Sequence, residues 1–419
     1  MCRVRQFISF VFVLYSPSTP SQAMNPHLNS LRGSPFVALR ALLDPLTPKA
    51  NVKPLALTIG EPQNQPPEFM KEVLAEQDHQ YGKYPPADGT PDQRNAISRW
   101  LNRRYDLPGG MVAEDRHIAP VNGTKEALYM IAQTVIDPTP TAAGKPVILM
   151  PNPYYHVYHA SAVMAGAEPV FLDAEKENNF FPDLDQLTPE LLDRTGAFYL
   201  CSPSNPQGTI AGRDYLVRVL ELARKHDFVL IMDECYTEIY DREVPIGILE
   251  VCRDLGGSLE NVLSFHSLSK RSSAAGLRSG FVAGDEKIIK PFLNLRNFAG
   301  AASPLPVCAA SAALWDDDSH VALNRDRYRT NIDIAERILK DRFEFYRPPG
   351  GFFLWLNVGD SVEATRKLWT EGGVRVLPGE YLAGTNENGH NPGAAYIRVA
   401  LVFDPDMMEE ALTRLANIL

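Results

Sequence analysis

The chain has 419 residues and a formal net charge of -10 at pH 7. Its 45% hydrophobic and 22% charged residues exclude a disordered or fibrous protein and favour an ordinary globular enzyme. The negative charge provides no overall attraction to nucleic acid or to an anionic membrane, so we expect neither partner. The cysteines are scattered, without a C-x-x-C pair or a cluster with histidine, which indicates reduced thiols in a cytoplasmic protein and no metal site.

Residues 1–23 superficially resemble a secretory signal, because Arg3 and Arg5 precede an apolar run over 7–15. That run is too short to span a bilayer. The alternative is that translation begins at Met24 and that residues 1–23 are a disordered upstream extension. We favour this alternative, because the rest of the chain has the character of a cytoplasmic protein.

The first predicted elements are a helix over 35–43 and a Pro-rich segment, 45–67, that links this helix to the rest of the chain. Further helices are predicted over 125–136 and 213–226, between short apolar runs. Runs that are apolar throughout are typical of strands buried on both faces of a largely parallel sheet. The predicted strands cover 147–150, 169–172, 197–201, 228–232, 262–266 and 280–283.

From about residue 309 the pattern changes to that of a smaller α+β domain. Its predicted elements are a helix over 321–340, a strand over 352–356, a helix over 362–371, strands over 374–377 and 396–402, and a helix from Pro405. A chain of this length favours two domains. We expect an N-terminal segment, 24–59, that packs on the smaller domain, a large α/β domain over 60–305, and a small domain over 306–419.

The strongest local feature is Ser267-Leu268-Ser269-Lys270, which directly follows the strand predicted over 262–266. In an open α/β sheet, ligands bind beyond the carboxyl ends of the strands, where these residues fall. A lone lysine in such a place is usually a solvated surface residue. Its function therefore depends on which other residues reach the same edge.

Asp233 and Tyr236 follow the strand predicted over 228–232, so a carboxylate and a phenol reach that edge. An Asp at a strand end is an ordinary turn residue, but the pyridine ring of pyridoxal phosphate (PLP) needs an anion beside its protonated nitrogen to act as an electron sink. Such a charge pair is worth on the order of 4 kcal/mol at about 4 Å and an effective dielectric constant near 20. Asn205 lies in a Pro/Gly turn after the preceding strand and can join Tyr236 in binding the ring oxygen.

Gly123-Thr124-Lys125 forms a glycine turn at the start of a predicted helix, where backbone N–H groups and the helix dipole favour a phosphate. Ser267 and Arg278 can add a hydroxyl and a bidentate cation. Near the C-terminus, Arg398 lies inside an apolar strand, where its burial requires an anionic partner. That partner is either a structural carboxylate or the α-carboxylate of a substrate.

Together these segments resemble the fold-type I PLP enzymes of the class I/II aminotransferase family, from about Pro35 to the end of the chain. The resemblance implies a PLP enzyme with an α/β large domain, whose mostly parallel sheet has helices on both faces, and a smaller α+β domain. The matching motifs, in the order of the family, are Gly60-Glu61-Pro62, Lys83-Tyr84-Pro85, Gly123-Thr124-Lys125, Pro153-Tyr154-Tyr155, Asn205-Pro206, Asp233-Glu234-Cys235-Tyr236, Ser267-Leu268-Ser269-Lys270, Arg278 and Arg398.

The resemblance also implies a role for each residue. Lys270 binds PLP covalently and then moves a proton between the substrate and the cofactor. Asp233 pairs with the pyridine nitrogen, and Tyr236 acts with Lys270 and Asp233 in catalysis. The remaining cofactor contacts are Tyr236 and Asn205 on the ring oxygen, Tyr155 on the ring face, and Gly123, Thr124, Lys125, Ser267 and Arg278 on the phosphate.

Amino acids and 2-oxo acids are the substrates that the resemblance implies. Arg398 would bind the α-carboxylate, with Asn205 and Gly60 beside it. Tyr84 would reach the phosphate bound by a neighbouring subunit, which implies a homodimer with shared sites.

The amino-acid sequences of several motifs are similar to those of the succinyldiaminopimelate aminotransferases of lysine biosynthesis. These enzymes exchange an amine between N-succinyl-LL-diaminopimelate and 2-oxoglutarate. Related chains act on aspartate, aromatic or other amino acids. Arg296 and Arg271 are candidates for binding a distal carboxylate, although a surface charge or an ion pair explains either arginine equally well.

Three other functions are possible. A PLP-dependent lyase or decarboxylase would share Lys270, Asp233 and Arg398. A PLP-sensing regulator would need a DNA-binding domain ahead of the core, and residues 1–34 are too few for one. A NAD-dependent dehydrogenase is disfavoured, because no G-x-G-x-x-G follows a predicted strand.

Overall fold

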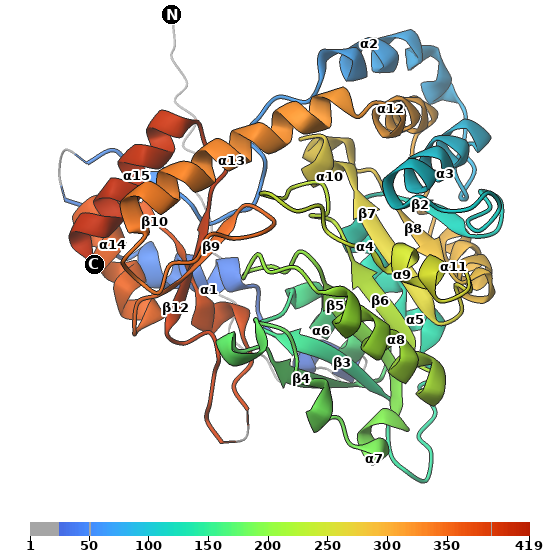
Figure 1. Ribbon diagram of the computed structural model, residues 1–419, viewed down its shortest axis with the longest axis horizontal. Helices are drawn as coiled ribbons and strands as arrows, with labels where there is room; N and C mark the ends of the chain where they lie inside the picture. Colours follow the sequence, from blue (N-terminus) through green and yellow to red (C-terminus); the bar gives the residue numbers. More distant parts are fainter. Residues whose placement is uncertain (1–24, 50–51, 387) are drawn as a thin grey trace, which may run out of the picture.

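The computed structural model describes residues 25–49, 52–386 and 388–419, and the extension predicted over 1–23 lies outside these residues (Figure 1). The largest sheet has seven strands in the order β2-β8-β7-β6-β5-β3-β4. These strands are β2 (Ile118–Val121), β3 (Val147–Asn152), β4 (Glu168–Asp173), β5 (Thr195–Cys201), β6 (Val229–Asp233), β7 (Val262–Ser267) and β8 (Gly280–Gly284).

Strand β8 is the one reversed strand of this sheet among the described residues. It pairs antiparallel with β2 and β7, whereas the strands from β7 to β4 pair in parallel. The predicted mostly parallel sheet is therefore confirmed. Strand β2 was not predicted, because Pro120 interrupts its short apolar run; a proline is tolerated here since β2 is an edge strand.

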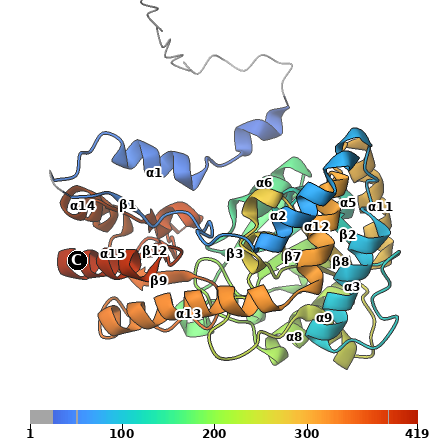
Figure 2. The ribbon, with the colours of Figure 1, turned by 90° about the horizontal axis from the view of Figure 1, so that it is seen from above.

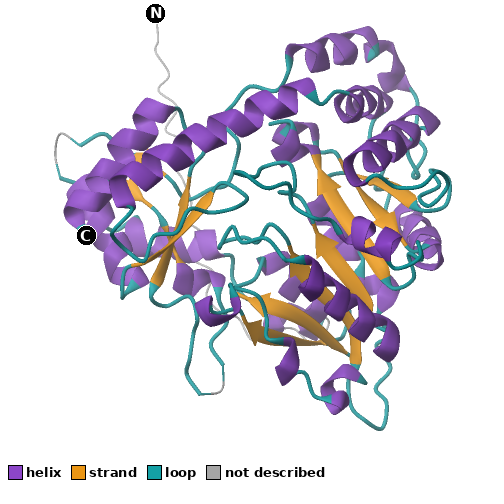
Figure 3. Cartoon of the chain, in the orientation of Figure 1, coloured by secondary structure: helices purple, strands orange, loops and turns teal. Residues whose placement is uncertain are grey.

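Helices cover both faces of the sheet, as Figure 3 shows. Alternate residues of one strand face opposite cores: Phe198 and Leu200 pack with one set of helices, and Ala197 and Tyr199 with the other. This explains why the strands read as continuous apolar runs. The first set is α3 (Pro91–Tyr105), α8 (Arg213–His226), α9 (Ile248–Asp254) and α12 (Leu305–Asp316); the second is α4 (Thr124–Met130), α5 (Ala132–Val135), α6 (His156–Met164) and α11 (Glu286–Phe298).

The helix predicted over 125–136 is divided into α4 and α5 at Ile131. The N–H of Thr134 donates to the carbonyl of Ile131 at 2.9 Å, an i to i-3 bond that tightens the second segment. The helix predicted over 213–226 is present as α8 with the same bounds.

The C-terminal part contains a three-stranded antiparallel sheet in the order β11-β12-β9. Its core includes Leu354, Leu368, Ile397 and Leu412, which are each at most 1% exposed. The elements are α13 (Ser319–Leu339), β9 (Phe353–Asn357), α14 (Ser361–Gly372), β10 (Val374–Arg375), β11 (Leu377–Pro378), β12 (Tyr396–Ala400) and α15 (Pro405–Ile418). Helix α13 runs from α12 toward α15 and links this part to the seven-stranded sheet (Figure 1).

The prediction of one continuous strand over 374–377 is wrong, because the structure has two short strands there. Strand β10 pairs in parallel with β1 (Leu55–Ala56), whereas β11 pairs antiparallel with β12. The two halves thus join different sheets on either side of the buried Val376. The partner β1 is distant in sequence, so the local pattern carried no sign of this division.

Helix α1 (Pro35–Leu43) has the predicted bounds. Ser34 caps its N-terminus, since the Ser34 hydroxyl accepts from the N–H of Phe36 at 3.3 Å. Its buried Leu39 and Leu43 pack in a cluster with Trp369 of α14. Figure 2 shows α1 lying beside α14. The remaining α-helices are α2 (Glu68–Glu76), α7 (Pro189–Leu192) and α10 (Leu268–Arg271).

Helix α12 begins at the boundary that we predicted between residues 305 and 306. It packs against α3, with Leu314 and Trp315 in the core of the seven-stranded sheet. The division of the chain into domains stays a prediction. No helix in the described part of the chain is long and apolar enough to cross a membrane.

Candidate functional site

A cavity of about 620 Å³ lies beyond the carboxyl ends of β5, β6 and β7, between the seven-stranded sheet and the C-terminal part. This is the position that open α/β sheets use for ligands. The structure brings most of the predicted site residues to its walls. They are Gly60, Thr124, Lys125, Tyr155, Asn205, Asp233, Tyr236, Ser267, Lys270, Arg278 and Arg398.

Lys270 lies in α10, the short helix that follows β7 directly. Its Nζ donates to the carbonyl oxygen of Gly60, and burial lowers the pKa of the Lys270 amine to about 8. A Cβ atom at Gly60 would lie 2.3 Å from the ring of Phe353, so a side chain there would push this carbonyl away from the lysine. Burial thus gives the Lys270 amine a larger neutral, nucleophilic fraction at near-physiological pH than an ordinary lysine has.

Asp233 is the last residue of β6 and is 6% exposed. Its carboxylate accepts from the hydroxyl of Tyr158 at 2.7 Å and from the N–H of Cys235 at 3.4 Å. Burial raises the pKa of Asp233. In the described part of the chain, neither lysine nor arginine forms an ion pair with it, so a cation bound in the cavity would find an uncompensated carboxylate.

Tyr158 was missed in the sequence. It lies on α6, three residues after Tyr155, and stacks on Tyr199 with 4.5 Å between ring centroids. Helical spacing places residues three apart on one face, which is the signal that could have found it. His156 on the same helix also lines the cavity and was missed; burial lowers the pKa of its imidazole to about 4, so this side chain is neutral at pH 7.

Asn205 connects two predicted site residues. Its Nδ2 donates to the hydroxyl of Tyr236 at 3.5 Å, and its Oδ1 accepts from Nη1 of Arg398 at 3.0 Å. The other arm of Arg398 donates to the carbonyl of Thr58 at 2.7 Å. These bonds fix the plane of the guanidinium at the cavity wall.

Arg398 is 5% exposed, and burial lowers its pKa to about 10. No carboxylate among residues 25–49, 52–386 and 388–419 forms an ion pair with it. A structural salt bridge was the alternative interpretation of this arginine, and the described residues do not provide one. A buried cation of this kind has a strong preference for an anion entering the cavity.

The predicted phosphate-binding residues gather around Gly123, which has a φ of 79°. A Cβ atom there would lie 2.2 Å from Nη2 of Arg278, so glycine allows the guanidinium to approach the start of α4. Arg278 donates to the carbonyls of Ala275 at 2.9 Å and Asn122 at 3.2 Å. Its guanidinium, exposed Lys125 and the hydroxyls of Thr124 and Ser267 therefore surround one end of the cavity.

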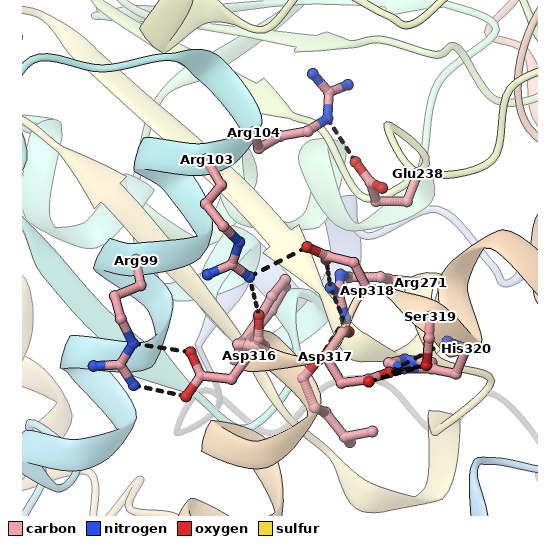
Figure 4. A network of polar contacts seen from close by, with 12 residues as sticks. Arg99, Arg103, Arg104, Glu238, Arg271, Asp316, Asp317, Asp318, Ser319 and His320 are labelled. Carbon is pink, nitrogen blue, oxygen red and sulfur yellow. Dashed lines mark hydrogen bonds and ion pairs between the residues drawn. The ribbon is translucent and has the colours of Figure 1, made fainter.

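Arg271 and Arg296 are not at the cavity, and the expectation that either binds a distal carboxylate is wrong for this chain's own cavity. Arg271 is 2% exposed and donates to the carbonyl of Leu314 at 2.6 Å and to Asp318, within the network of Figure 4. Arg296 is 1% exposed and pairs with Glu126. Both arginines are held by fixed partners, because a buried guanidinium is costly without them.

Tyr84 is also absent from the cavity of its own chain. Its side chain is fully exposed, with a relative accessibility of 101%. Among the residues that the structure describes, none forms a hydrogen bond or a ring contact with Tyr84.

The residues at the cavity fit PLP. Asp233 is a buried carboxylate that lacks a cationic partner among the described residues, as a pyridinium would require. Lys270 provides an amine, and the absence of a side chain at Gly123 allows the Arg278 guanidinium to lie against the start of α4. Arg398 also lines the cavity and has the charge to bind a substrate carboxylate.

The model of the family "Aminotransferase class I and II" matches residues 52–415. The chain is 32% identical over 364 residues to the 4-dedimethylamino-4-oxo-anhydrotetracycline transaminase OxyQ of Streptomyces rimosus, covering 86% of this chain and 92% of that protein. It is 29% identical over 374 residues to the LL-diaminopimelate aminotransferase of Dehalococcoides mccartyi, covering 87% and 90% of the two chains.

The crystal structure of an aminotransferase from Neisseria meningitidis Z2491 has a TM-score of 0.89 to this chain. The two are 38% identical, and the match covers 94% of this chain and 99% of the other. The fold, the cavity and these relatives agree. The chain belongs to the class I and II aminotransferase family, and it is a PLP-dependent, fold-type I transaminase that acts on amino acids and 2-oxo acids.

Proposed function

We propose that this transaminase is a succinyldiaminopimelate aminotransferase, which transfers the amine of N-succinyl-LL-diaminopimelate to 2-oxoglutarate. The substrate class is supported by the amino-acid sequences of the motifs and by the similarity of the chain to an LL-diaminopimelate aminotransferase. One observation carries the amino-acid chemistry: buried Arg398 lacks a carboxylate partner among the described residues and lines the same cavity as the Lys270 amine.

Lys270 is the residue that binds the cofactor covalently and moves the proton. When bound, PLP supplies an electron sink that acidifies the substrate Cα–H. The Lys270 amine would hold the cofactor and would serve as the base that takes the proton from the substrate Cα and as the acid that gives it back. Burial suits it to this task, since a pKa of about 8 leaves roughly a tenth of the amine neutral at pH 7, far more than an ordinary lysine has.

Asp233 holds the charge that the cofactor ring requires. Its carboxylate is oriented by Tyr158, which is itself fixed against Tyr199. Tyr236 and Asn205, joined by a 3.5 Å hydrogen bond, bind the ring oxygen, and Tyr155 stacks on the ring. The phosphate is held by the set around Gly123, namely Thr124, Lys125, Ser267 and Arg278.

Arg398 orients the substrate through its α-carboxylate. Since Asn205 and Thr58 already hold its guanidinium, little side-chain entropy is lost when the substrate binds. Gly60 contributes its carbonyl, and its lack of a side chain allows the ring of Phe353 to pack against it. The substrate Cα is thereby directed toward Lys270.

The candidate reactions differ in the group that the substrate carries at the far end of its side chain. The arginines that line the cavity are Arg278 and Arg398 within the described residues, and both are assigned to other anions. An aspartate or broad-specificity aminotransferase is the main alternative. A PLP-dependent lyase on the same fold is the other.

We infer that the enzyme is a homodimer in which Tyr84 of one subunit binds the cofactor phosphate of the other. The support is the complete exposure of Tyr84, which has no hydrogen bond or ring contact with the described residues of its own chain. Tyr81 nearby is 61% exposed. Contacts across a subunit interface would bury both aromatic side chains.

The first prediction concerns the stability of the cofactor-free protein. The Lys270 pKa is about 8 when folded against an ordinary value of 10.5, so the unfolded state binds more protons between these values and folding stability rises with pH. Lys270→Met should stabilise the protein by about 3 kcal/mol at pH 7. This advantage should fall by about 2 kcal/mol between pH 7.5 and 9.5 in urea unfolding. Lys125→Met, at an exposed lysine of the cavity, is the control and should show no such trend; an equal trend in both variants would contradict the prediction.

The second prediction concerns Arg398. Arg398→Ala should lower kcat/KM for amino-acid donors by about 100-fold or more, because two charge-assisted hydrogen bonds to the α-carboxylate are lost. The half-reaction with a simple alkylamine has no carboxylate to lose and should change by less than about 3-fold. Equal losses for both donors would show that Arg398 has a purely structural role.

The third prediction concerns the substrate. With 2-oxoglutarate as acceptor, N-succinyl-LL-diaminopimelate should exceed aspartate, tyrosine and alanine in kcat/KM by about 10-fold or more, the discrimination expected of a pocket built for one side chain. Glutamate formation is the measurement. A preference for aspartate would support the alternative aminotransferase, and release of ammonia and pyruvate would indicate a lyase.

The fourth prediction concerns Tyr84. Tyr84→Ala should weaken PLP binding by about 10-fold, corresponding to one lost hydrogen bond to a charged group. Tyr81→Ala is the matched control and should leave the dissociation constant unchanged. Size-exclusion chromatography should give a dimer for the wild type; a monomer that retains full PLP affinity would refute the shared site.

A further inference from the structure

Asn324 on α13 uses all four hydrogen-bonding positions of its side-chain amide and is 7% exposed. Its Nδ2 donates to the main-chain carbonyl of Lys270 at 3.0 Å and to that of Arg271 at 3.2 Å. Its Oδ1 accepts from Nδ2 of Asn64 at 3.1 Å and from the hydroxyl of Ser273 at 3.0 Å. Since carbonyl groups can only accept, these contacts determine the orientation of the amide.

The two arms of this amide reach the two segments that hold Lys270. One segment is the lysine's own loop, in which α10 is only four residues long and Ser273 has a φ of 51°. The other contains Gly60, whose carbonyl accepts from Nζ of Lys270, and continues to Asn64. The catalytic lysine and its acceptor are therefore joined through one side chain of a long helix.

The start of helix α13 and the turn before it also bind the loop that follows Lys270. His320, one turn before Asn324, contacts the hydroxyl of Ser272 through Nε2 at 2.8 Å. Arg271 is bonded to the turn between α12 and α13, as Figure 4 shows. The loop after Lys270 is thus bonded to the start of α13 at several points, but Asn324 alone among these contacts also reaches the segment of Gly60.

We propose that Asn324 is a positioning residue of the transaminase, which sets the distance between the Lys270 amine and the carbonyl of Gly60 and so keeps the amine at the cavity wall. This inference rests on the proposed role of Lys270 as the cofactor-binding lysine. Loss of the amide would separate the two segments. The amine would then gain water and lose its fixed position for proton transfer.

The same helix offers a matched control. Asn331 is 3% exposed, and its Nδ2 donates to two main-chain carbonyls, those of Leu401 at 3.1 Å and Phe403 at 2.8 Å. It resembles Asn324 in residue type, helix, burial and bonds to the main chain. It has no bond to Lys270, to its loop or to the segment of Gly60.

The experiment compares Asn324→Ala with Asn331→Ala. In the cofactor-free protein, acetic anhydride labelling of Lys270, quantified by peptide mass over pH 6 to 11, reports the pKa of the amine without any turnover. Asn324→Ala should raise this pKa by about 0.5 or more, because burial is what lowers it and hydration reverses that effect. In the PLP enzyme, kcat should fall by about 10-fold or more while KM changes by less than about 3-fold, the pattern of a misplaced catalytic group.

Asn331→Ala should lower the melting temperature to a similar extent but leave the pKa of Lys270 and kcat unchanged. If Asn324→Ala fails to fold, Asn64→Ala carries the test, since it removes only the arm toward Gly60 and should shift the pKa in the same direction by less. In a double-mutant cycle, Asn64→Ala should add nothing to the pKa change of Asn324→Ala.

Two outcomes separate this inference from the proposed role of Lys270. Borohydride reduction of the wild-type PLP enzyme should leave the cofactor attached to Lys270. Attachment to another lysine would overturn the assignment of Lys270 itself. Attachment to Lys270 with an unchanged pKa and kcat in Asn324→Ala, or with equal changes in Asn331→Ala, would overturn the positioning role of Asn324.

Discussion

The constraint on which this structure depends is the burial of three ionisable groups around one cavity. Burial lowers the pKa of Lys270 and of Arg398 and raises that of Asp233, so in each case it disfavours the charged form. An isolated buried charge is tolerated only when hydrogen bonds or a bound ion compensate it. Here the hydrogen bonds come from the protein, and none of the three groups has an ion-pair partner among the described residues. In our proposal, a pyridinium ring and an amino-acid carboxylate supply the counter-ions of Asp233 and Arg398.

The register of the sheet supplies the rigidity that this arrangement needs. Cys201 at the end of β5 pairs with Asp233, and Asp233 pairs with Phe265 of β7. The turn that carries Asn205 and the helix that carries Lys270 therefore leave the sheet beside the same carboxylate. Arg398 comes from a different sheet and is hydrogen-bonded to Asn205, so the carboxylate site that we propose lies where the two parts of the chain meet.

Much of this could be predicted from the sequence, because the signals are local. Continuous apolar runs marked the buried strands, and Asp233 and Lys270 immediately follow two of them. Strand β2 was missed because Pro120 is acceptable only at an edge, and the edge is a property of the whole sheet. The separation of β10 from β11 depends on β1, more than three hundred residues earlier, and is invisible in a local pattern.

Among the site residues, too, those with a local signal could be predicted and those that depend on distant partners could not. Arg398 stood out because a charge within an apolar strand is costly to bury. Asp233, an ordinary strand-end residue by itself, became a candidate because Tyr236, Asn205 and Lys270 were predicted at the same sheet edge. Arg271 and Arg296 looked equally free in the sequence, yet their partners Asp318 and Glu126 lie far away in the chain. Tyr158 carries no charge, and its helical spacing from Tyr155 was the one local sign of its contact with Asp233. Asn324 lies in an ordinary helical pattern, and only the tertiary fold brings it to Lys270.

The reversed strand β8 has a consequence for how the site tolerates change in chain length. Because β8 returns antiparallel to β7, the chain from Leu268 to Ser279 stays at the cavity edge instead of crossing a face of the sheet. Lys270 and Arg278 thus share one short connection, whose ends are fixed by strand pairing. Surface loops usually accept insertions at small cost, but an insertion in this connection would change the spacing between the lysine and the arginine. We therefore expect its length to be the least variable of the loops around the cavity.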